Sequence, residues 1–354
     1  MEDSPLDLPS PDPIVALQVV GEGWELALSP AQHNFALGTL EPPAVDLSLP
    51  GKTYVSERHA YLSRRGEILT VTDNRSRNGT FHRGYRRPYC EITAGSSFRV
   101  ADVRLLALNE HLRILRKHLL WCLGFDAHAQ VDQALEDLAD AESPGVLLVG
   151  PRDCDQRALA EAIHQTSARR HHAFVVAEPP LRTRAEEVAT LRRARSGTLL
   201  LDLDTVEPLA FFVEHLFGPT YHVRPIIAAQ STKQAEDKLG RDHARRLRPI
   251  LTLPAVAERR DDIEPLLDGL LKLDGCPFRI RDVGEKNLDA LVHRHRWRRN
   301  FVDLRETARR CRALLETWIQ ADAAERLAIS GSTLSEWLAT LGMSWPPPGE
   351  RPSR

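Results

Sequence analysis

The first third of the chain alternates short apolar stretches with turn-forming residues. Seven stretches carry β-branched or alternating apolar residues and are bounded by Gly, Pro, Asn or Ser. They are residues 13–20, 24–29, 33–40, 59–65, 67–74, 96–101 and 103–109. Short strands at this spacing are typical of a β-sandwich. The pattern therefore predicts an all-β sandwich at residues 13–110.

The hydrophobic pattern changes after residue 110. Residues 112–125 carry apolar side chains at helical spacing, which predicts a helical linker at 111–136. Further along, strand-like stretches alternate with helical ones; the strands are 144–150, 173–178, 197–204 and 224–230, and the helices 157–167, 184–194 and 207–217. This alternation predicts an α/β domain with a parallel sheet at 137–256. The pattern from about 257 to 343 is helical.

Composition narrows the class of protein. The 354 residues suffice for two or three domains, and 42% hydrophobic with 27% charged residues is typical of soluble globular protein. No apolar run approaches the roughly 20 residues of a membrane span, and the acidic, Pro-rich start does not have the pattern of a secretory signal. We therefore expect a cytoplasmic protein without a membrane partner, and disordered tails at 1–12 and 344–354.

Net charge and cysteine content exclude further classes of protein. A net charge of −2 argues against a globally basic coat for nucleic acid. The five cysteines lie far apart in the sequence and form no CxxC pair. We therefore expect reduced, mostly buried thiols, and neither a disulfide framework nor a metal site.

Two motifs stand in the predicted sandwich, SERHAYL at 56–62 and DNRSRNGTF at 73–81. Their order and spacing resembles the forkhead-associated (FHA) domain, a family whose loops recognise phosphothreonine peptides. The resemblance covers about 95 residues. It implies that Gly38, His59 and Gly79 shape the loops.

The resemblance also implies the ligand contacts. Ser56 matches the hydroxyl that contacts phosphate, with Arg58 as a nearby cation, and Asn78, with Arg77 beside it, matches the amide that holds the peptide backbone. A phosphate dianion needs such hydroxyl, amide and guanidinium donors. The family arginine that follows the first glycine is Thr39 here, and the loss of such a charge-assisted hydrogen bond costs roughly 1.5–3 kcal/mol. We predict a phosphothreonine-containing protein partner; the alternative is a sandwich that binds unphosphorylated protein, or nothing.

Five later segments are similar, in the same order, to the AAA+ ATPase domain of sigma-54-dependent transcriptional activators. They are LAEAIHQTSARRHHAFVV, SGTLLLDLD, RPIIAAQST, LPAVAERRDDIEPLL and RWRRNFVDLRETARR. The resemblance runs from about 137 to 312. It implies a P-loop-like α/β core at 137–256 and a helical lid at 257–315.

The nucleotide-binding loop of that family is altered in this chain. The family sequence GExGxGKE is replaced by GPRDCDQR, in which Gly150 is retained and Gln156 stands in place of the phosphate-binding lysine. Asp153 and Asp155 replace glycines that let backbone amides approach phosphate. Two carboxylates in this loop would also repel a polyphosphate. We therefore expect neither nucleotide turnover nor an ATP cofactor.

A second catalytic position is altered as well. Asp202 is retained, but Leu203 replaces the glutamate that would polarise the attacking water. No other GxxxxGK[ST] motif occurs in the chain. Since the family assembles as rings, we expect the core to serve as an assembly or interaction scaffold, with a homo-oligomer as one outcome. The less favoured alternative is an ATP-dependent sigma-54 activator.

The lid segment is locally basic. The run HRHRWRRN at 293–300 is followed by Arg305, Arg309, Arg310 and Arg312. One interpretation is contact with DNA, RNA or an acidic protein. The other is a solvated helix face around a packed Trp297.

The segment DAAERLAISGSTLSEWLATLGM resembles the Fis-type helix-turn-helix that closes many such activators, which implies a domain at 316–343. The basic residues of the family's reading helix are replaced by Glu336, Trp337, Ala339 and Thr340, so this helix neutralises no phosphate. The remaining candidate DNA contacts are Ser332, Thr333 and Ser335. A dimerisation or protein-contact role is the alternative.

These features predict a non-enzymatic signalling or transcription-regulatory protein. Its FHA-like module would bind a protein partner, its AAA+-like core would act as a scaffold, and its helix-turn-helix would bind DNA. The alternative is an adaptor of a larger cytosolic complex with no DNA role.

Overall fold

A computed structural model describes residues 12–139, 145–179, 181, 183–208 and 210–347. The chain divides into two compact units. One contains the residues up to 147 together with 157–228 and 232–251, and the other contains 148–156, 229–231 and the residues from 252 onward. The loop at 150–156 therefore belongs to the same unit as the C-terminal helices. The predicted tails at 1–12 and 344–354 lie outside the described residues, except for Asp12 and residues 344–347.

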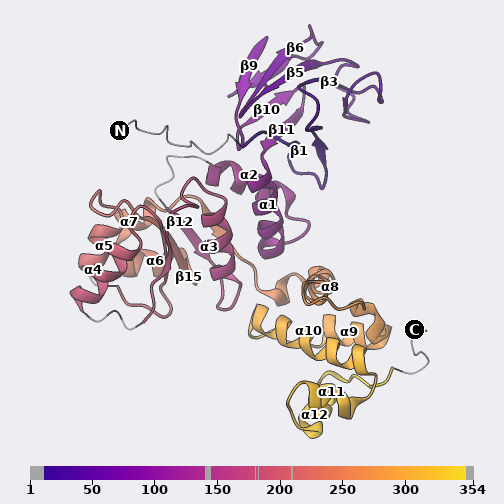
Figure 1. The fold of residues 1–354 in the computed structure, drawn as a ribbon, viewed down its shortest axis with the longest axis vertical. Coiled ribbons are helices and arrows are strands. Elements are labelled where there is room, and N and C mark those ends of the chain that lie inside the picture. Colours follow the sequence, from indigo (N-terminus) through magenta and orange to yellow (C-terminus); the bar gives the residue numbers. More distant parts are fainter. Residues whose placement is uncertain (1–11, 140–144, 180, 182, 209, 348–354) are drawn as a thin grey trace, which may run out of the picture. The chain divides into compact units, whose positions relative to one another are not determined.

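Residues 16–108 form the predicted β-sandwich (Figure 1). Its sheets have the strand orders β2-β1-β11-β10-β7-β8 and β4-β3-β5-β6-β9. The described pairs are antiparallel except β3 with β4. The strands are β1 Ala16–Val19, β2 Glu25–Ala27, β3 Asn34–Gly38, β4 Leu47–Ser48, β5 Ala60–Arg65, β6 Ile68–Asp73, β7 Thr80–His82, β8 Tyr85–Arg86, β9 Tyr89–Ile92, β10 Ser97–Val100 and β11 Val103–Leu108.

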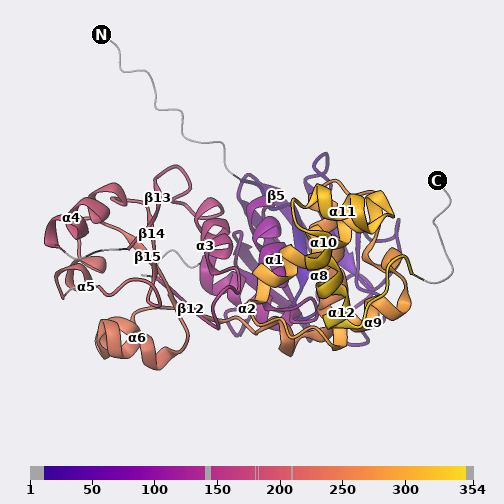
Figure 2. The same ribbon diagram turned by 90° about the horizontal axis from the view of Figure 1, so that it is seen from below.

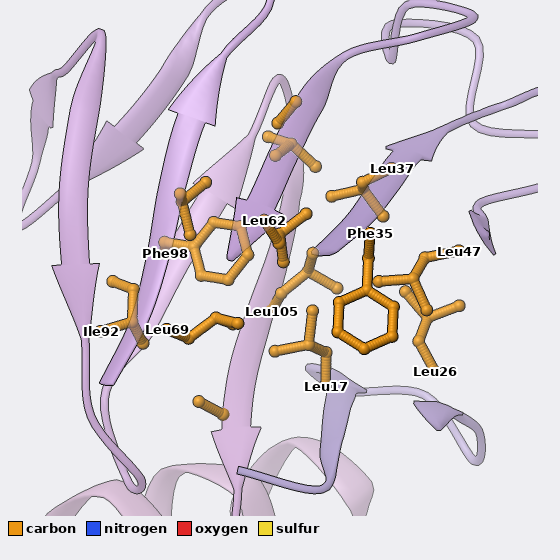
Figure 3. Close-up of a cluster of buried hydrophobic side chains, with 14 of the residues drawn as sticks. Leu17, Leu26, Phe35, Leu37, Leu47, Leu62, Leu69, Ile92, Phe98 and Leu105 are labelled. Carbon is orange, nitrogen blue, oxygen red and sulfur yellow. The ribbon is translucent and has the colours of Figure 1, made fainter. Parts of the chain in front are cut away.

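The facing sides of the two sheets supply the core of the sandwich. Along β5, buried positions such as Leu62 alternate with exposed ones such as Tyr61, because successive side chains of a strand point to opposite faces. Phe35, Leu62 and Phe98, from three different strands, lie in one buried cluster (Figure 3). Each large apolar side chain buried in this way contributes about 1.5–3 kcal/mol relative to exposure. The core thus provides a rigid base for the loops that join the strands.

Four strands of the sandwich are not predicted by the apolar pattern. β4 and β8 have two residues each and β7 has three. The alternation of buried Val45, Leu47 and Leu49 around β4 is a period-two signal that could have predicted that strand. β9 has only two buried positions, Cys90 and Ile92, between exposed polar neighbours. These strands are defined by pairing with distant segments rather than by their own sequences.

Two helices follow the sandwich where the linker is predicted, α1 (Glu110–Leu123) and α2 (His128–Ala139). α1 begins at Asn109, whose side chain accepts a hydrogen bond from the Leu112 amide at 2.9 Å. Arg116 of α1 and Asp132 of α2 form a buried ion pair with a 2.8 Å contact. The same carboxylate accepts a hydrogen bond from the Gly21 amide at 2.9 Å. Loss of one member of a buried pair costs about 3–5 kcal/mol, so this pair fixes both helices to the β1–β2 turn.

The next part of the chain is an α/β fold whose sheet has the order β13-β14-β15-β12-β16. β13, β14 and β15 pair in parallel, which confirms the predicted parallel sheet. The sequence pattern does not predict β16, which has three residues. The strands are β12 Val146–Val149, β13 Phe174–Val176, β14 Thr198–Asp202, β15 Arg224–Ala229 and β16 Ile250–Thr252, and the helices are α3 Gln156–Gln165, α4 Arg184–Arg193, α5 Ala210–Leu216, α6 Thr232–Leu239 and α7 Arg241–Arg245.

The C-terminal part is helical. α10 packs against α8 and α11, and α11 packs against α12 (Figures 1 and 2). Beyond α12, the Trp345 ring stacks on Trp318 with centroids 5.2 Å apart, so the first residues of the predicted tail at 344–354 are packed. The helices are α8 Ile263–Leu273, α9 Glu285–His293, α10 Asn300–Thr317, α11 Gln320–Arg326 and α12 Gly331–Leu341. No helix among the described residues combines the length and apolarity needed to cross a membrane.

Candidate functional site

The buried His59 ring joins the two motif-bearing loops at one end of the sandwich. Its Nδ1 accepts a hydrogen bond from the Ser56 amide at 3.1 Å, and its Nε2 lies 3.1 Å from the Gly79 carbonyl oxygen. Because Nδ1 is the acceptor, the ring is the neutral tautomer that carries its proton on Nε2. Burial lowers the pKa of His59, although the Gly79 carbonyl and nearby Asp73 oppose that shift. The predicted loop-shaping role of His59 therefore has a defined geometry.

The second loop is organised around the Asp73 carboxylate. It accepts hydrogen bonds from the Ser76 amide at 2.9 Å, the Ser76 hydroxyl at 2.6 Å and the Thr80 hydroxyl at 2.8 Å. Burial alone would raise the pKa of Asp73, but these hydrogen bonds outweigh it, and the pKa is lowered. The Ser76 hydroxyl in turn accepts from the Gly79 amide at 2.9 Å. Gly79 adopts φ +80°, a conformation that favours glycine.

The predicted ligand contacts lie on these two loops. The Arg77 amide donates to the Ser56 hydroxyl at 3.2 Å, and the Asn78 side-chain amide donates to the Tyr54 carbonyl at 2.7 Å. Arg58 is exposed two residues after Ser56, and Arg77 is also exposed. Within the described residues, neither guanidinium forms an ion pair with a carboxylate. The structure thus brings Ser56, Arg77 and Asn78 together and leaves two cations available beside them.

Gly38 and Thr39 contact the first of these loops. A Cβ atom on Gly38 would lie 1.9 Å from the Glu57 carbonyl oxygen, so only glycine fits there. The Thr39 amide donates to the Ser56 carbonyl at 3.3 Å. The residue that stands in place of the family arginine is therefore directly beside the predicted phosphate contact.

Sequence reasoning missed Asp73 and three further residues that shape the site. Tyr54 supplies the carbonyl that holds Asn78, Ser76 links Asp73 to Gly79, and Arg86 donates to the Ser76 carbonyl at 3.3 Å. The spacing of Asp73 and Ser76 is a signal that could have been used, since Asp and Ser side chains often bond backbone groups a few residues away. Arg86 gave no such signal, because it reaches the loop from another strand.

The altered loop at 150–156 is tied to the helical part of its own unit. Asp153 and Asp155 both adopt φ +62°, which is a costly conformation for residues other than glycine. The Arg305 guanidinium of α10 forms an ion pair with the Asp155 carboxylate. The side chain of Asp155 is 10% exposed and that of Arg305 is 49% exposed. One of the two carboxylates in this loop therefore already has a cationic partner.

Backbone groups of the loop are engaged as well. The Asn300 side-chain amide donates to the Arg152 carbonyl at 2.8 Å, and its oxygen accepts from the Val256 amide at 3.0 Å. The Phe301 amide donates to the Asp153 carbonyl at 2.9 Å. These bonds orient the loop toward the first turn of α10.

Gly150 and Gln156 make local contacts. A Cβ atom on Gly150 would lie 2.6 Å from the Leu253 carbonyl oxygen, so packing alone requires glycine at this position. The Gln156 side chain donates to the Pro151 carbonyl at 2.6 Å. A retained Gly150 is thus explained without a phosphate ligand.

Asp202 and Leu203 lie at the end of β14. The Asp202 carboxylate accepts a hydrogen bond from the Asp204 amide at 2.9 Å, and the Leu203 amide donates to the Ala228 carbonyl at 2.9 Å. The Leu203 side chain is fully buried. At this position Asp202 supports a turn, and Leu203 belongs to the apolar core.

The candidate DNA contacts lie on α12, whose first turn is capped by the Ser330 hydroxyl. The hydroxyls of Ser332 and Thr333 are 2.8 and 2.7 Å from the Ser330 hydroxyl. Ser335 donates to the Gly331 carbonyl at 2.9 Å. All three residues are exposed, but their hydroxyls are partly engaged, and α12 contains no Lys or Arg.

Comparison with known proteins identifies the domain family of the β-sandwich. Residues 36–101 match the family model "FHA domain", so an FHA domain is present, and this match covers the N-terminal domain only. The sequence matches no curated protein.

Several solved structures are similar to parts of the chain. NtrX from Brucella abortus in complex with ATP is 20% identical, covers 66% of this chain and 68% of its own, and has a TM-score of 0.40. EmbR from Mycobacterium tuberculosis in complex with a low-affinity phosphopeptide is 23% identical, with coverages of 27% and 24% and a TM-score of 0.24. The FHA domain of the CT664 protein from Chlamydia trachomatis is 17% identical, with coverages of 27% and 97% and a TM-score of 0.24.

Proposed function

We propose that this chain is a non-catalytic regulatory protein whose FHA domain docks it onto a phosphothreonine-containing protein. The observation that carries the proposal is the pair of loops in a matched FHA domain, which place Ser56, Arg77 and Asn78 together. A hydroxyl, an amide and guanidinium groups are the donors that a phosphorylated peptide needs.

The substitution at Thr39 leaves the phosphate without one family cation. Arg58 and Arg77 are exposed on the same two loops and are unpaired among the described residues. They can supply positive charge to the phosphate dianion of a peptide, because guanidinium groups bind phosphate through several N–H donors. We infer that these two arginines compensate in part for Thr39.

The docking role is tested by the affinity of the full chain for phosphothreonine peptides. A phosphothreonine peptide library selects a sequence, and calorimetry then compares that peptide with its unphosphorylated form. Ser56→Ala and Asn78→Ala should each weaken binding by roughly tenfold or more, since a hydrogen bond to a charged group contributes about 1.5–3 kcal/mol. Ser63→Ala and Asn34→Ala are the matched controls, because both residues lie in the same domain outside the two loops.

A gain of affinity provides a sharper test than a loss. Thr39→Arg restores the family cation beside Ser56 and should tighten phosphopeptide binding by about tenfold, a result that misfolding cannot produce. Equal affinity for the phosphorylated and unphosphorylated peptides would instead support the alternative, a sandwich that recognises unphosphorylated protein.

The non-catalytic part of the proposal is supported by the loop at 150–156. Asp153 and Asp155 occupy the family's glycine positions, and Arg305 already neutralises Asp155. Leu203, in place of the catalytic glutamate, is fully buried in the core. We propose that this core serves as a scaffold for assembly or for partner contacts.

A second function, DNA binding, is favoured by the geometry of α11 and α12. Ala328 adopts φ +54° between the two helices, and α12 presents Ser332 and Thr333 in its first turn. A helix pair of this kind can place its second helix in the major groove. We propose that this helix-turn-helix contacts DNA; an adaptor without a DNA role is the competing function.

A further inference from the structure

The C-terminal unit contains two contrasting groups of arginines. Those on α10 are paired with carboxylates: Arg305 with Asp155, Arg309 and Arg310 with Glu306, and Arg312 with Glu316. Each of these guanidinium groups is held by a carboxylate, and Glu306 holds two of them. They are therefore poor candidates for binding an external anion.

The turn between α9 and α10 has the opposite character. Arg294, Arg296, Arg298 and Arg299 are exposed. In the part of the chain that the structure describes, none of these four guanidinium groups forms an ion pair. Four positive charges within six residues, with no acidic residue among them, therefore face solvent.

This arginine turn (residues 294–299) is held by buried residues. Trp297 is 2% exposed at φ +48°, and Asn300 is 4% exposed at φ +40°. The His295 ring lies against Trp297 with centroids 4.0 Å apart, and its Nδ1 accepts from the Trp297 amide at 3.0 Å. The guanidinium groups thus extend from an anchored turn, which lowers the conformational cost of binding.

The arginine turn adjoins the second helix of the helix-turn-helix. Gly342 ends α12, and a Cβ atom on it would lie 2.6 Å from the Arg294 guanidinium. Asn287 of α9 also exchanges hydrogen bonds of 2.9 and 3.1 Å with the backbone of Ser344. Through Arg294, the arginine turn therefore adjoins the C-terminal end of a helix that has no cation of its own.

We propose that the arginine turn binds the phosphate backbone of duplex DNA and supplies the positive charge that α12 lacks. The proposal rests on the DNA-binding role proposed above and deepens it. Phosphate contacts position a protein on the duplex, while base contacts from the recognition helix specify the sequence. Guanidinium groups suit the first task, because each presents several N–H donors to phosphate oxygens.

The test is fluorescence anisotropy of the full chain with a labelled mixed-sequence duplex, between about 50 and 200 mM salt. The variant Arg296→Gln/Arg298→Gln/Arg299→Gln should weaken binding at least about tenfold. It should also reduce the slope of log K against log salt by about 2–3, since each phosphate contact contributes about 0.9. The matched control is Arg241→Gln/Arg281→Gln/Arg309→Gln, which removes the same charge from exposed arginines that pair with carboxylates. Thermal unfolding of both variants confirms that they are folded.

The possible results distinguish failure of phosphate binding by the arginine turn from failure of DNA binding itself. Loss of affinity in the first variant with less than about a threefold change in the control supports the proposal. Equal losses in the two variants, or no loss in the first, would overturn it while leaving DNA binding intact. Absence of salt-dependent binding by the wild-type chain would overturn the DNA role itself. Competition by poly-glutamate as strong as that by unlabelled duplex would assign the arginine turn to acidic proteins and also overturn the proposal.

Discussion

At the scale of single residues, the FHA loops are held by buried polar groups. His59 joins one loop to the other, and Asp73 and Ser76 close the second loop on itself. Each of these groups satisfies its hydrogen bonds inside the domain, which is the condition for burying it without a large cost. The arrangement leaves the Arg58 and Arg77 side chains at the surface, where a ligand can reach them.

The buried His59 predicts a pH dependence of stability. Its pKa is lowered from the ordinary value of 6.5, so the unfolded chain binds the proton more tightly than the folded one. The stabilisation is complete above about pH 6.5 and is lost as the pH falls from there through the lowered value. Urea unfolding at about pH 7.5 and 5.5 should show a larger drop for the wild type than for His59→Gln, which keeps a donor and an acceptor but does not titrate in this range.

The same experiment has an internal check. The pKa of Asp73 is lowered from 3.8, so that carboxylate stays ionised throughout this window and does not contribute to the difference. NMR titration of the His59 ring measures the proton equilibrium directly. A folded-state pKa at or above 6.5 would contradict the prediction.

Residue-level prediction from sequence is confined to positions that a motif marks. The SxxH and NGT patterns mark Ser56, His59, Asn78 and Gly79 as loop residues. The Ser56–His59 contact spans three residues, whereas the contact of His59 with Gly79 joins the two motifs across twenty residues. The spacing could not identify Arg86, since its contact with Ser76 depends on how β7 and β8 fold back. Nor could it show that Gly150 is needed for packing against Leu253, about a hundred residues away.

At the scale of elements, the loop at 150–156 and α10 form one connected structure. Asp155 pairs with Arg305, and Asn300 and Phe301 bond the carbonyls of Arg152 and Asp153. The strained backbone conformations of Asp153 and Asp155 direct the loop toward α10, where these contacts form. The loop and the helix should therefore lose their order together.

A double-mutant cycle measures this coupling. Asp155→Ala and Arg305→Ala should each destabilise the chain, and the double variant should cost less than the sum, with a coupling of about 0.5–1 kcal/mol because Arg305 is half-exposed. Hydrogen exchange of the backbone amides at 150–156 should accelerate in both single variants. Arg309→Ala is the matched control, one turn further along α10 and paired with Glu306. Additive effects would show that the ion pair does not stabilise the loop.

Element prediction from the hydrophobic pattern depended on length. The pattern found β12, β14 and α10, which carry continuous or periodic apolar residues. It found β2 and β13, which have three residues each, because they lie within longer apolar stretches, and it did not find β4, β7, β8, β9 or β16. Such short strands form because they pair with neighbouring strands. The partner strand is known only from the fold and cannot be recognised in the sequence of the segment itself.

At the scale of the whole molecule, the sequence combines an FHA domain with an α/β fold whose loop at 150–156 carries two acidic residues. We predict that calorimetric titration with ATP and Mg²⁺ gives no binding tighter than about 1 mM, because Asp153 in place of a glycine and Gln156 in place of the lysine both disfavour polyphosphate. Asp202→Ala should leave that result unchanged. The combined variant Asp153→Gly/Asp155→Gly/Gln156→Lys is the comparison, since it restores the family's glycines and lysine. Micromolar binding with turnover by the wild type would contradict a non-catalytic role.

The ion pair of Asp155 and Arg305 has a consequence for when the loop at 150–156 takes up its structure in the cell. A loop that carries its own counterion acquires its arrangement when the chain folds, not when a metabolite arrives. We therefore expect this core to be indifferent to the size of the adenylate pool, from starvation to rapid growth. If the protein switches between states, the signal must enter elsewhere, and we expect it at the FHA domain, through phosphorylation of the proposed ligand.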